Sequence, residues 1–333
     1  MRRDVYVGLT STIFIMLFLA ACFAGCTSQA PAAATPTAAP AVAGPQTLVI
    51  ATTTSLYDTK LLDYLQQKFE AKYTGVTLKI TSQGSGKAIE LAKNGDADVL
   101  LVHSPAAELS FMKDGYGLNR RTFASNYFMI VGPVNDPAGI KDMSPEDAFK
   151  ALFEKGTSKT AGVAFVSRGD NSGTHTVEKN IWKNAKYNYT TQIQKSGDWY
   201  IEAGKGMGET LQMASEKGAY TLTDEGTYLA YKKDLKLVPV VSKGASLLNI
   251  YSVMTVYNTK QPADKIKMAN NFVNFLIDPA TQADIGTFGV DKYGKALFIP
   301  MTAEVPTAAE GWVGNHTAPA TETAPAVIRG SGI

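Results

Sequence analysis

The sequence is almost free of cysteine. Its 333 residues contain only Cys22 and Cys26, and both lie in an N-terminal stretch with the features of a signal peptide. Residues 27–333 contain no thiol, so the folded part of the chain cannot hold a structural disulfide. Histidine is also scarce. His103 and His175 do not show the spacing of metal ligands, so we predict no metal site.

The sequence also lacks a large net charge and, beyond its N-terminus, a long apolar run. The 32 Lys and Arg residues and 30 Asp and Glu residues leave a formal net charge of +2, and the basic residues are scattered. A nucleic-acid-binding surface needs a clustered basic face, so the sequence argues against that class of partner. Beyond the N-terminus, no window reaches the roughly 18 apolar residues that a membrane-spanning helix needs.

The N-terminal residues 1–26 predict export and lipid attachment. Arg2 and Arg3 precede an apolar run over residues 5–21, which ends in small residues followed by cysteine. This is the pattern of a secretory signal peptide, and small residues before a cysteine resemble a lipobox, in which the cysteine becomes the lipidated N-terminus. Cys22 has the better-matching residues before it, but we favour Cys26 because it directly precedes the polar linker. A plain signal peptide and an uncleaved anchor are the alternatives.

Two stretches rich in Ala, Pro and Thr frame the folded part. Residues 27–46 cannot bury enough apolar surface to offset their ordering entropy, so we interpret them as a tether. Residues 306–333 have a similar composition and predict a flexible C-terminal tail. Asn188 and Asn315 stand in glycosylation sequons, but the motif is short and common, so chance is the better explanation for both.

Between these stretches, short apolar runs alternate with segments of helical periodicity. Such alternation predicts an α/β fold with mainly parallel sheets. We expect strands at residues 48–50, 76–80, 99–102, 128–131, 164–166, 219–222, 238–241 and 251–256, and helices at residues 59–73, 87–93, 106–113, 145–153, 173–184, 210–217, 223–232 and 265–276.

Three segments share one design: an apolar strand, a turn of hydroxyl and glycine residues, and then a helix. They include residues 51–55, 82–87 and 167–175. In open α/β sheets, ligands bind beyond the carboxyl ends of the strands, where helix N-termini attract anions. The alternative for the first segment is an ordinary N-cap and polar turn. Residues 82–87 are not a P-loop, because Thr81 and Ala88 stand where that motif needs Gly and Ser or Thr.

Arg168 makes the third segment the most specific. Its guanidinium can donate bidentate, charge-assisted hydrogen bonds to two oxygens of one anion. Asp170 could orient this guanidinium from behind, and Ser172, Gly173 and Thr174 open the next helix with hydroxyl and N–H donors. A salt-bridged surface loop is the structural alternative.

The side chains of these turns are almost all donors, which favours an anion that carries no proton. Tungstate, molybdate and sulfate fit that requirement. Hydrogen phosphate needs an acceptor for its own proton, and Asp170 could supply one unless Arg168 engages it. The residues therefore predict a site for a tetrahedral oxyanion and leave phosphate as an alternative.

Five short motifs stand along the folded part. They are Thr-Thr-Thr-Ser at 52–55, Asn-Gly-Asp-Ala-Asp-Val at 94–99, Asp-Gly-Tyr-Gly at 114–117, Ser-Arg-Gly-Asp-Asn-Ser-Gly-Thr-His at 167–175 and Ala-Tyr-Thr-Leu-Thr-Asp at 219–224. In order and spacing they resemble the TupA-type tungstate-binding proteins of ABC importers, and the likeness runs from about Thr47 to Pro300.

The resemblance implies an α/β fold of the type II periplasmic-binding-protein class. In this fold, two α/β lobes are joined by a two-strand hinge and close on a ligand in the interlobe cleft. It implies one lobe over residues 47–125 and 247–305, a second lobe over residues 126–246, and a hinge near residues 123–128 and 240–248.

The resemblance also implies a set of ligand-binding residues. They are Thr53, Thr54, Ser55, Ser85, Arg168, Ser172, Gly173 and Thr174, with the turn around Ser85 departing from the Thr-Gly turn typical of the family. Arg120 or Arg121 is a candidate second cation, although both fit a surface position better.

The implied ligand is tungstate, and molybdate cannot be separated from it by charge, shape or size. The implied partner is the membrane permease of an ABC importer. The resemblance implies a monomer at the outer face of the cell membrane, without a cofactor.

Other functions remain as alternatives. The chain could be a phosphate- or sulfate-binding protein of an ABC importer or, from another class, a surface sensory or adhesion module. An enzyme fits less well, because Ser172, His175 and Asp170 crowd one turn, whereas a catalytic triad places its base on a separate element. We therefore predict no catalytic residue.

Overall fold

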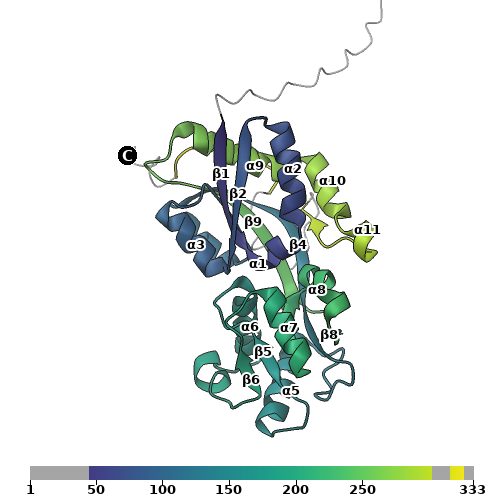
Figure 1. Cartoon of the computed structure of the whole chain (residues 1–333). Coiled ribbons are helices and arrows are strands. Elements are labelled where there is room, and N and C mark those ends of the chain that lie inside the picture. Colours follow the sequence, from purple (N-terminus) through teal and green to yellow (C-terminus); the bar gives the residue numbers. More distant parts are fainter. Residues whose placement is uncertain (1–44, 302–315, 326–333) are drawn as a thin grey trace, which may run out of the picture. The chain divides into compact units, whose positions relative to one another are not determined.

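The computed structural model describes residues 45–301 and 316–325, which fold into two α/β lobes (Figure 1). The predicted signal peptide, Cys22, Cys26 and most of the predicted tether lie outside the described residues, as does Asn315. Within the described ranges, no helix is long and apolar enough to cross a membrane.

The first lobe is built on a mixed sheet with the strand order β10-β4-β9-β3-β1-β2. β1 pairs in parallel with β2 and β3, whereas β9 is antiparallel to both β3 and β4. The strands are β1 (Gln46–Thr53), β2 (Val76–Gln83), β3 (Val99–Val102), β4 (Gly117–Pro133), β9 (Leu248–Val256) and β10 (Ile299–Pro300). The helices are α1 (Thr54–Asp58), α2 (Leu61–Lys72), α3 (Ser85–Asn94), α4 (Pro105–Lys113), α9 (Ala263–Ile277), α10 (Pro279–Thr287) and α11 (Val290–Tyr293).

The core of the first lobe lies on both faces of this sheet, because successive side chains of a strand point to opposite sides. In β1, Leu48 and Ile50 belong to the apolar cluster that includes Phe69 of α2 and Phe272 of α9. Ala51 instead belongs to the cluster formed with α3 and α4. Helices on both faces hold the carboxyl end of β1 in place, and the first predicted turn follows from there.

The second lobe surrounds the far part of β4. There β7 and β8 pair antiparallel with β4, and a bridge between Phe165 and Tyr220 connects the parallel pair β5-β6 to this group. The strands are β5 (Phe165–Ser167), β6 (Tyr200–Glu202), β7 (Thr221–Asp224) and β8 (Leu237–Val241). The helices are α5 (Pro145–Thr157), α6 (Gly173–Asn184), α7 (Met207–Lys217) and α8 (Glu225–Tyr231), with short helices η1 (Tyr189–Ile193), η2 (Lys232–Asp234) and η3 (Ala245–Leu247).

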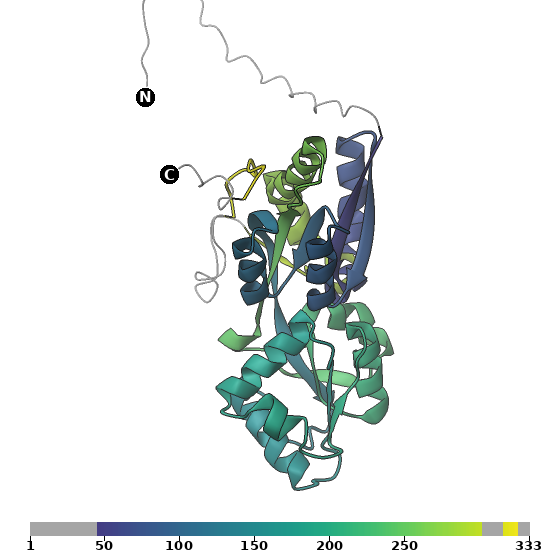
Figure 2. The same ribbon diagram turned by 90° about the vertical axis from the view of Figure 1, so that its left-hand side faces the viewer.

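Two neighbouring strands connect the lobes. β4 leaves the first lobe where Ala124 pairs with Tyr251 and Asn126 pairs with Asn249, and β9 returns the chain alongside it. Figures 1 and 2 show this pair between the two lobes. The crossing falls at the predicted hinge ranges, while the lobe boundaries and the hinge motion remain predictions.

The α/β prediction is confirmed, but the expectation of mainly parallel sheets is wrong. β4 is 17 residues long and pairs antiparallel with β7, β8, β9 and β10. Apolar patterns predict strands but carry no information on strand direction. The expected helix over residues 59–73 is found as α2, which begins two residues later, at Leu61, because Lys60 adopts a left-handed conformation with φ of 69°.

Residues 316–325 depart from the expectation of a flexible tail. Asn274 exchanges two hydrogen bonds with the backbone of Ala320, which is buried in the core of the first lobe. Arg121 donates to the carbonyl oxygens of Ala318 and Pro319. Polar side chains of the first lobe therefore fix this segment, although its own composition is that of a linker.

Candidate functional site

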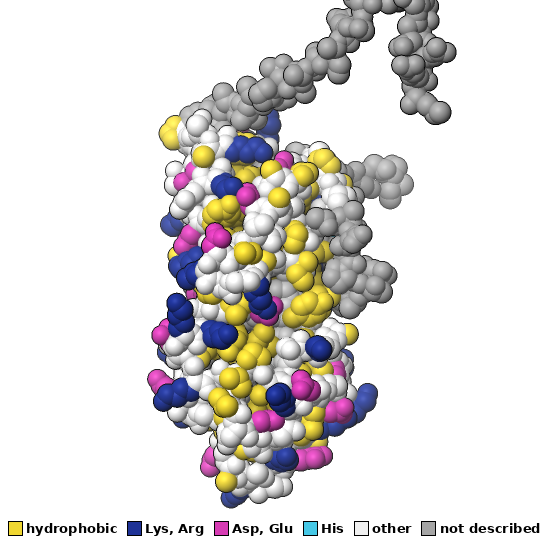
Figure 3. Space-filling model, turned by 90° about the vertical axis from the view of Figure 1, so that its right-hand side faces the viewer, with side chains coloured by type: hydrophobic (Ala, Val, Ile, Leu, Met, Phe, Trp, Pro, Cys, Tyr) yellow, Lys and Arg dark blue, Asp and Glu magenta, His cyan; other side chains and the backbone are white. Residues whose placement is uncertain are grey.

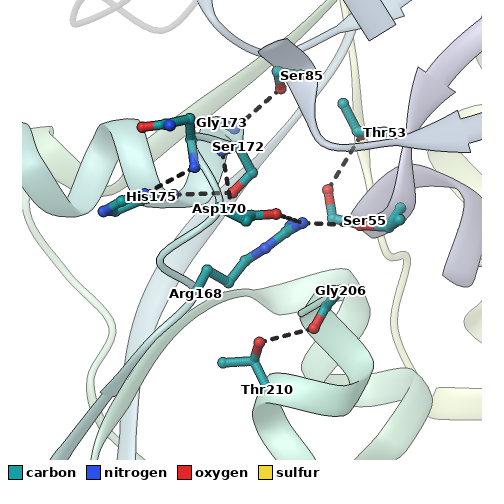
Figure 4. Close-up of polar contacts among 12 residues, drawn as sticks. Thr53, Ser55, Ser85, Arg168, Asp170, Ser172, Gly173, His175, Gly206 and Thr210 are labelled. Carbon is teal, nitrogen blue, oxygen red and sulfur yellow. Dashed lines mark hydrogen bonds and ion pairs between the residues drawn. The ribbon is translucent and has the colours of Figure 1, made fainter. Parts of the chain in front are cut away.

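The three predicted turns meet between the lobes. β1 leads into α1, β2 into α3 and β5 into α6, so three helix N-termini come together (Figure 4). Arg168 Nη2 donates to Thr54 Oγ1 at 3.1 Å, and the backbone N–H of Gly173 donates to Ser85 Oγ at 3.0 Å. Both contacts join one lobe to the other, which brings residues far apart in the sequence into one site.

Arg168 lies at the centre of this site and is only 2% exposed. Its Nη2 forms an ion pair with Asp170 Oδ2 at 2.6 Å, and the other Asp170 oxygen accepts from the backbone N–H of Ser172 at 3.1 Å. Nε and Nη1 of Arg168 are buried and have no hydrogen-bond partner among the described residues. A buried donor without a partner is costly, so these two N–H groups suit a bound acceptor.

The hydroxyl groups of the site fall into two kinds. Thr174 Oγ1 is buried and, like the two guanidinium nitrogens, has no partner within the described part of the chain. By contrast, Ser85 accepts from Gly173, and Ser55 Oγ lies 3.2 Å from His103 Nε2 and 3.3 Å from Thr53 Oγ1. Thr174 therefore has no partner, Ser85 acts as an acceptor and keeps its own hydrogen to donate, and Ser55 has two polar neighbours.

A cavity of about 180 Å³ opens beside Arg168. Only Thr54 and Arg168 of the predicted ligand-binding residues line it, and the other six are packed behind its wall or around it. Gln83, Gly84 and Lys87 of the second predicted turn and Asp170 of the third also line it, whereas the sequence analysis missed Gly204, Lys205, Gly206 and Glu209. Residues 204–206 follow β6 and open α7, so they repeat the same strand–turn–helix design.

The comparisons with known proteins agree with this geometry. The family model for the PBP superfamily domain matches residues 30–280. A tungstate-binding protein TupA of Peptoclostridium acidaminophilum is 42% identical over 257 residues, which are 77% of this chain and 86% of the relative. The solved TupA of Desulfovibrio alaskensis G20 is 42% identical, with a TM-score of 0.63 over 78% of this chain and all of that chain. The chain belongs to the TupA family of solute-binding proteins.

A second solved relative extends this finding. The tungstate ABC transporter structure from Geobacter sulfurreducens is 41% identical and covers 71% of this chain and 95% of that chain, with a TM-score of 0.61. Membership of the TupA family confirms the predicted fold class and the predicted class of binding protein over that of an enzyme. Proteins of this family act outside the cytoplasm, so the chain is assigned there.

The contacts of the histidines fit a TupA-family binding protein better than a hydrolase. Ser172 Oγ accepts from the backbone N–H of His175 as the N-cap of α6. The His175 ring instead accepts from Asn171 N–H and contacts the Tyr189 hydroxyl, so it does not face Ser172 Oγ. Among the described residues, no group of three or more His, Cys, Asp and Glu side chains could hold a metal ion.

Arg120 and Arg121 lie outside the candidate site. The expected surface position is wrong for Arg120, whose guanidinium forms a buried ion pair with Glu108 at 2.8 Å. Arg121 donates to the backbone of residues 318 and 319. Arg168 is therefore the arginine at the site, while Lys87 and Lys205 add positive charge at its cavity.

Two carboxyl groups near Arg168 are shifted towards their neutral forms. Burial and the adjacent Asp224 carboxylate raise the pKa of Asp58 to about 6, and burial raises the pKa of Asp224 as well. Both shifts reflect the cost of burying a negative charge in this part of the protein. On the face shown in Figure 3, positive and negative side chains are interspersed.

Proposed function

We propose that the chain captures tungstate outside the cytoplasm and delivers it to the membrane permease of an ABC importer, with molybdate as the second candidate ligand. The observation that carries the proposal is the buried guanidinium of Arg168, whose Nε and Nη1 have no partner among the described residues. The relatives whose names state tungstate binding support the choice of ligand.

The ligand-binding residues of this proposal are Thr53, Thr54, Ser55, Ser85, Arg168, Ser172, Gly173 and Thr174. Arg168 and Thr174 offer the free donors, and the N-termini of α1, α3 and α6 add backbone N–H groups with the positive ends of their dipoles. Thr54, whose hydroxyl accepts from Arg168, lies at the cavity and can donate its own proton.

The contacts of Asp170 favour an anion without a proton. One of its oxygens accepts from Arg168 and the other from Ser172 N–H, so both are engaged in the site itself. Hydrogen phosphate would need such an acceptor for its own proton. This arrangement supports tungstate, molybdate or sulfate over phosphate. The sequence analysis left phosphate open only if Arg168 did not engage Asp170.

Lipid attachment completes the proposal. A lipidated Cys26, or Cys22 in its place, followed by the tether of residues 27–46, would hold a monomeric binding protein at the outer face of the membrane. Mass spectrometry of the protein from a membrane fraction tests this part, because a diacylglycerol adduct on the N-terminal cysteine identifies which of the two is used. An unmodified, freely secreted chain would contradict it.

Calorimetric titration of the mature protein with tungstate, molybdate, sulfate and phosphate tests the ligand. We expect tight binding of tungstate and no heat from phosphate. Arg168→Ala should weaken tungstate binding by at least 100-fold, because two hydrogen bonds to a charged partner contribute about 3–6 kcal/mol. Arg168→Lys is the matched variant that keeps the charge and loses the planar fork, and it should bind with intermediate affinity. Unchanged affinity in Arg168→Ala would remove the assignment.

A further inference from the structure

A chain of buried polar contacts leads from the hinge strands to Ser55. Asn249 on β9 donates through Nδ2 to Asn126 Oδ1 on β4 at 2.8 Å. The Asn249 Oδ1 atom lies 2.8 Å from His103 Nδ1, and His103 Nε2 lies 3.2 Å from Ser55 Oγ. All four residues are at most 2% exposed, so water does not interrupt the chain.

These contacts fix where the proton of a neutral His103 ring sits. Because the Asn249 amide nitrogen donates to Asn126, its oxygen faces the ring and requires a hydrogen on Nδ1. In the neutral ring, Nε2 then carries a lone pair and accepts. The Ser55 hydroxyl must donate to Nε2, which leaves Ser55 unable to donate to an anion.

We propose that His103 is a positioning residue for the oxyanion: it takes up one proton from solvent as the anion binds, and the protonated ring turns the Ser55 hydroxyl towards the anion. With a hydrogen on both ring nitrogens, Nε2 donates to Ser55 Oγ, and Ser55 then donates its own hydrogen to the ligand. The inference rests on the proposed function and adds a proton to the binding step.

The charges around the ring favour this step. Burial lowers the pKa of His103 to about 4, and the nearby charge of Arg168 acts in the same direction. Asp170 pairs with Arg168 and offsets its charge, so a doubly negative anion would meet little net positive charge from this pair. Two negative charges in a low-dielectric interior strongly favour the protonated form of a nearby ring.

The elements packed against His103 offer few competing groups. Arg168 and Asp170 face it from the second lobe, and the Tyr251 ring of β9 stacks on it at 5.0 Å. Phe128 of β4 and Gly173 of α6 close two further sides. On α4, which follows His103, Glu108 pairs with Arg120. Lys183 of α6 lines a cavity of about 350 Å³ that His103 also lines.

Proton uptake can be measured directly on the wild-type protein. Tungstate is titrated calorimetrically at pH 7 in buffers of different ionisation enthalpy, and the slope of the observed enthalpy gives the number of protons exchanged. We expect uptake of close to one proton per anion, and affinity that rises up to tenfold per unit of falling pH. A slope of zero, or proton release, overturns the inference while leaving tungstate binding intact. If wild-type protein gives no binding at all, it is the proposed function that fails.

Two substitutions test the contributions of the two His103 ring nitrogens separately. His103→Asn can still donate to Asn249 but cannot reach Ser55, whereas His103→Gln reaches Ser55 with an amide that needs no extra proton. Both should lose proton uptake, and His103→Gln should bind more tightly than His103→Asn, with affinity independent of pH.

His175→Asn and Asp58→Asn are the controls, because His175 does not contact Ser55 and the pKa of Asp58 is raised to about 6. Both should keep the uptake, and circular dichroism confirms folding of each variant. Full uptake in His103→Asn, or its loss in Asp58→Asn alone, would contradict the assignment to His103.

Discussion

The anion-binding role proposed for Thr174 comes with a cost in stability. The residue is 1% exposed, and its buried hydroxyl has no hydrogen-bond partner among the described residues. Thr174→Val keeps the shape and removes the hydroxyl. We expect the free energy of unfolding of the ligand-free protein to rise by about 1 kcal/mol, and the Kd for tungstate to rise at least tenfold.

Chemical denaturation and calorimetry measure the two effects of Thr174→Val. Thr176→Val is the matched control two residues further along α6, where the hydroxyl donates to the carbonyl oxygen of Ser172. That control should lose a little stability and keep its affinity. A Thr174→Val protein that is destabilised but binds normally would show that Thr174 has only a structural role.

Glu178 supports the Arg168 loop and makes stability depend on pH. Its carboxyl accepts from Ser167 Oγ, which in turn accepts from the N–H of Gly169 beside Arg168. Burial raises the pKa of Glu178 from 4.5 to about 7 in the folded protein. Because the folded state holds this proton more tightly, the contribution to stability is complete below pH 4.5 and is lost as the pH rises through about 7.

Glu178→Gln cannot ionise and should remove that loss. Relative to the wild type, its free energy of unfolding should improve by up to about 3 kcal/mol between pH 5 and pH 8. Urea denaturation of both proteins at each pH measures the difference. The lowered pKa values of His103 and His175 affect both proteins equally and cancel. A constant difference across this range would refute the role of Glu178.

Among the elements, the N-terminus of α6 must approach the first lobe closely. A Cβ atom added at Gly173 would stand 2.8 Å from two atoms of the His103 ring, which is too close for a buried ring to accommodate. Because the clash lies between lobes, the predicted opening at the hinge would relieve it in the ligand-free protein. Gly173→Ala should therefore raise the Kd for tungstate more than tenfold without lowering the melting temperature of the ligand-free protein.

Gly86→Ala is the matched test of this reasoning. Gly86 lies in α3 at the same site, but an added Cβ would meet only the Asn171 carbonyl oxygen at 3.5 Å, an ordinary contact. Its affinity should stay within about twofold of the wild type, since a contact at that distance costs little. Equal losses in both variants would mean that any added methyl group disturbs the site.

The strand–turn–helix elements explain what the sequence could predict and what it could not. Hydroxyl and glycine residues after apolar strands identified the three turns, because strand ends and helix starts have local signals. The turn at residues 204–206 escaped notice because it is Gly-Lys-Gly and contains no hydroxyl residue. The state of Ser55 was also unpredictable, since its partner His103 is 48 residues away in the sequence.

The molecule as a whole has a second feature that composition did not reveal. Residues 316–325 resemble a linker, yet Asn119 and Asn270 bind the Glu322 backbone while Asn274 binds the Ala320 backbone. The partners in the segment are backbone groups, which every residue carries. The arrangement of Arg121 and the asparagines on β4 and α9 selects this path, and no local sequence pattern predicts it.

Removing this segment should therefore weaken the fold without touching the site. A chain that ends at residue 315 loses the buried Ala320 side chain and the hydrogen bonds to Arg121, Asn119, Asn270 and Asn274. Each bond contributes about 1 kcal/mol, part of which offsets the ordering entropy of the segment, so we expect a loss of about 2–4 kcal/mol in the free energy of unfolding.

Tungstate affinity should stay within about twofold, because none of these residues lines the cavity beside Arg168. Asn274→Ala in the full chain should reproduce roughly a third of the loss. Urea denaturation and calorimetry decide the matter, and weaker tungstate binding by the shortened chain would show that the segment influences the site.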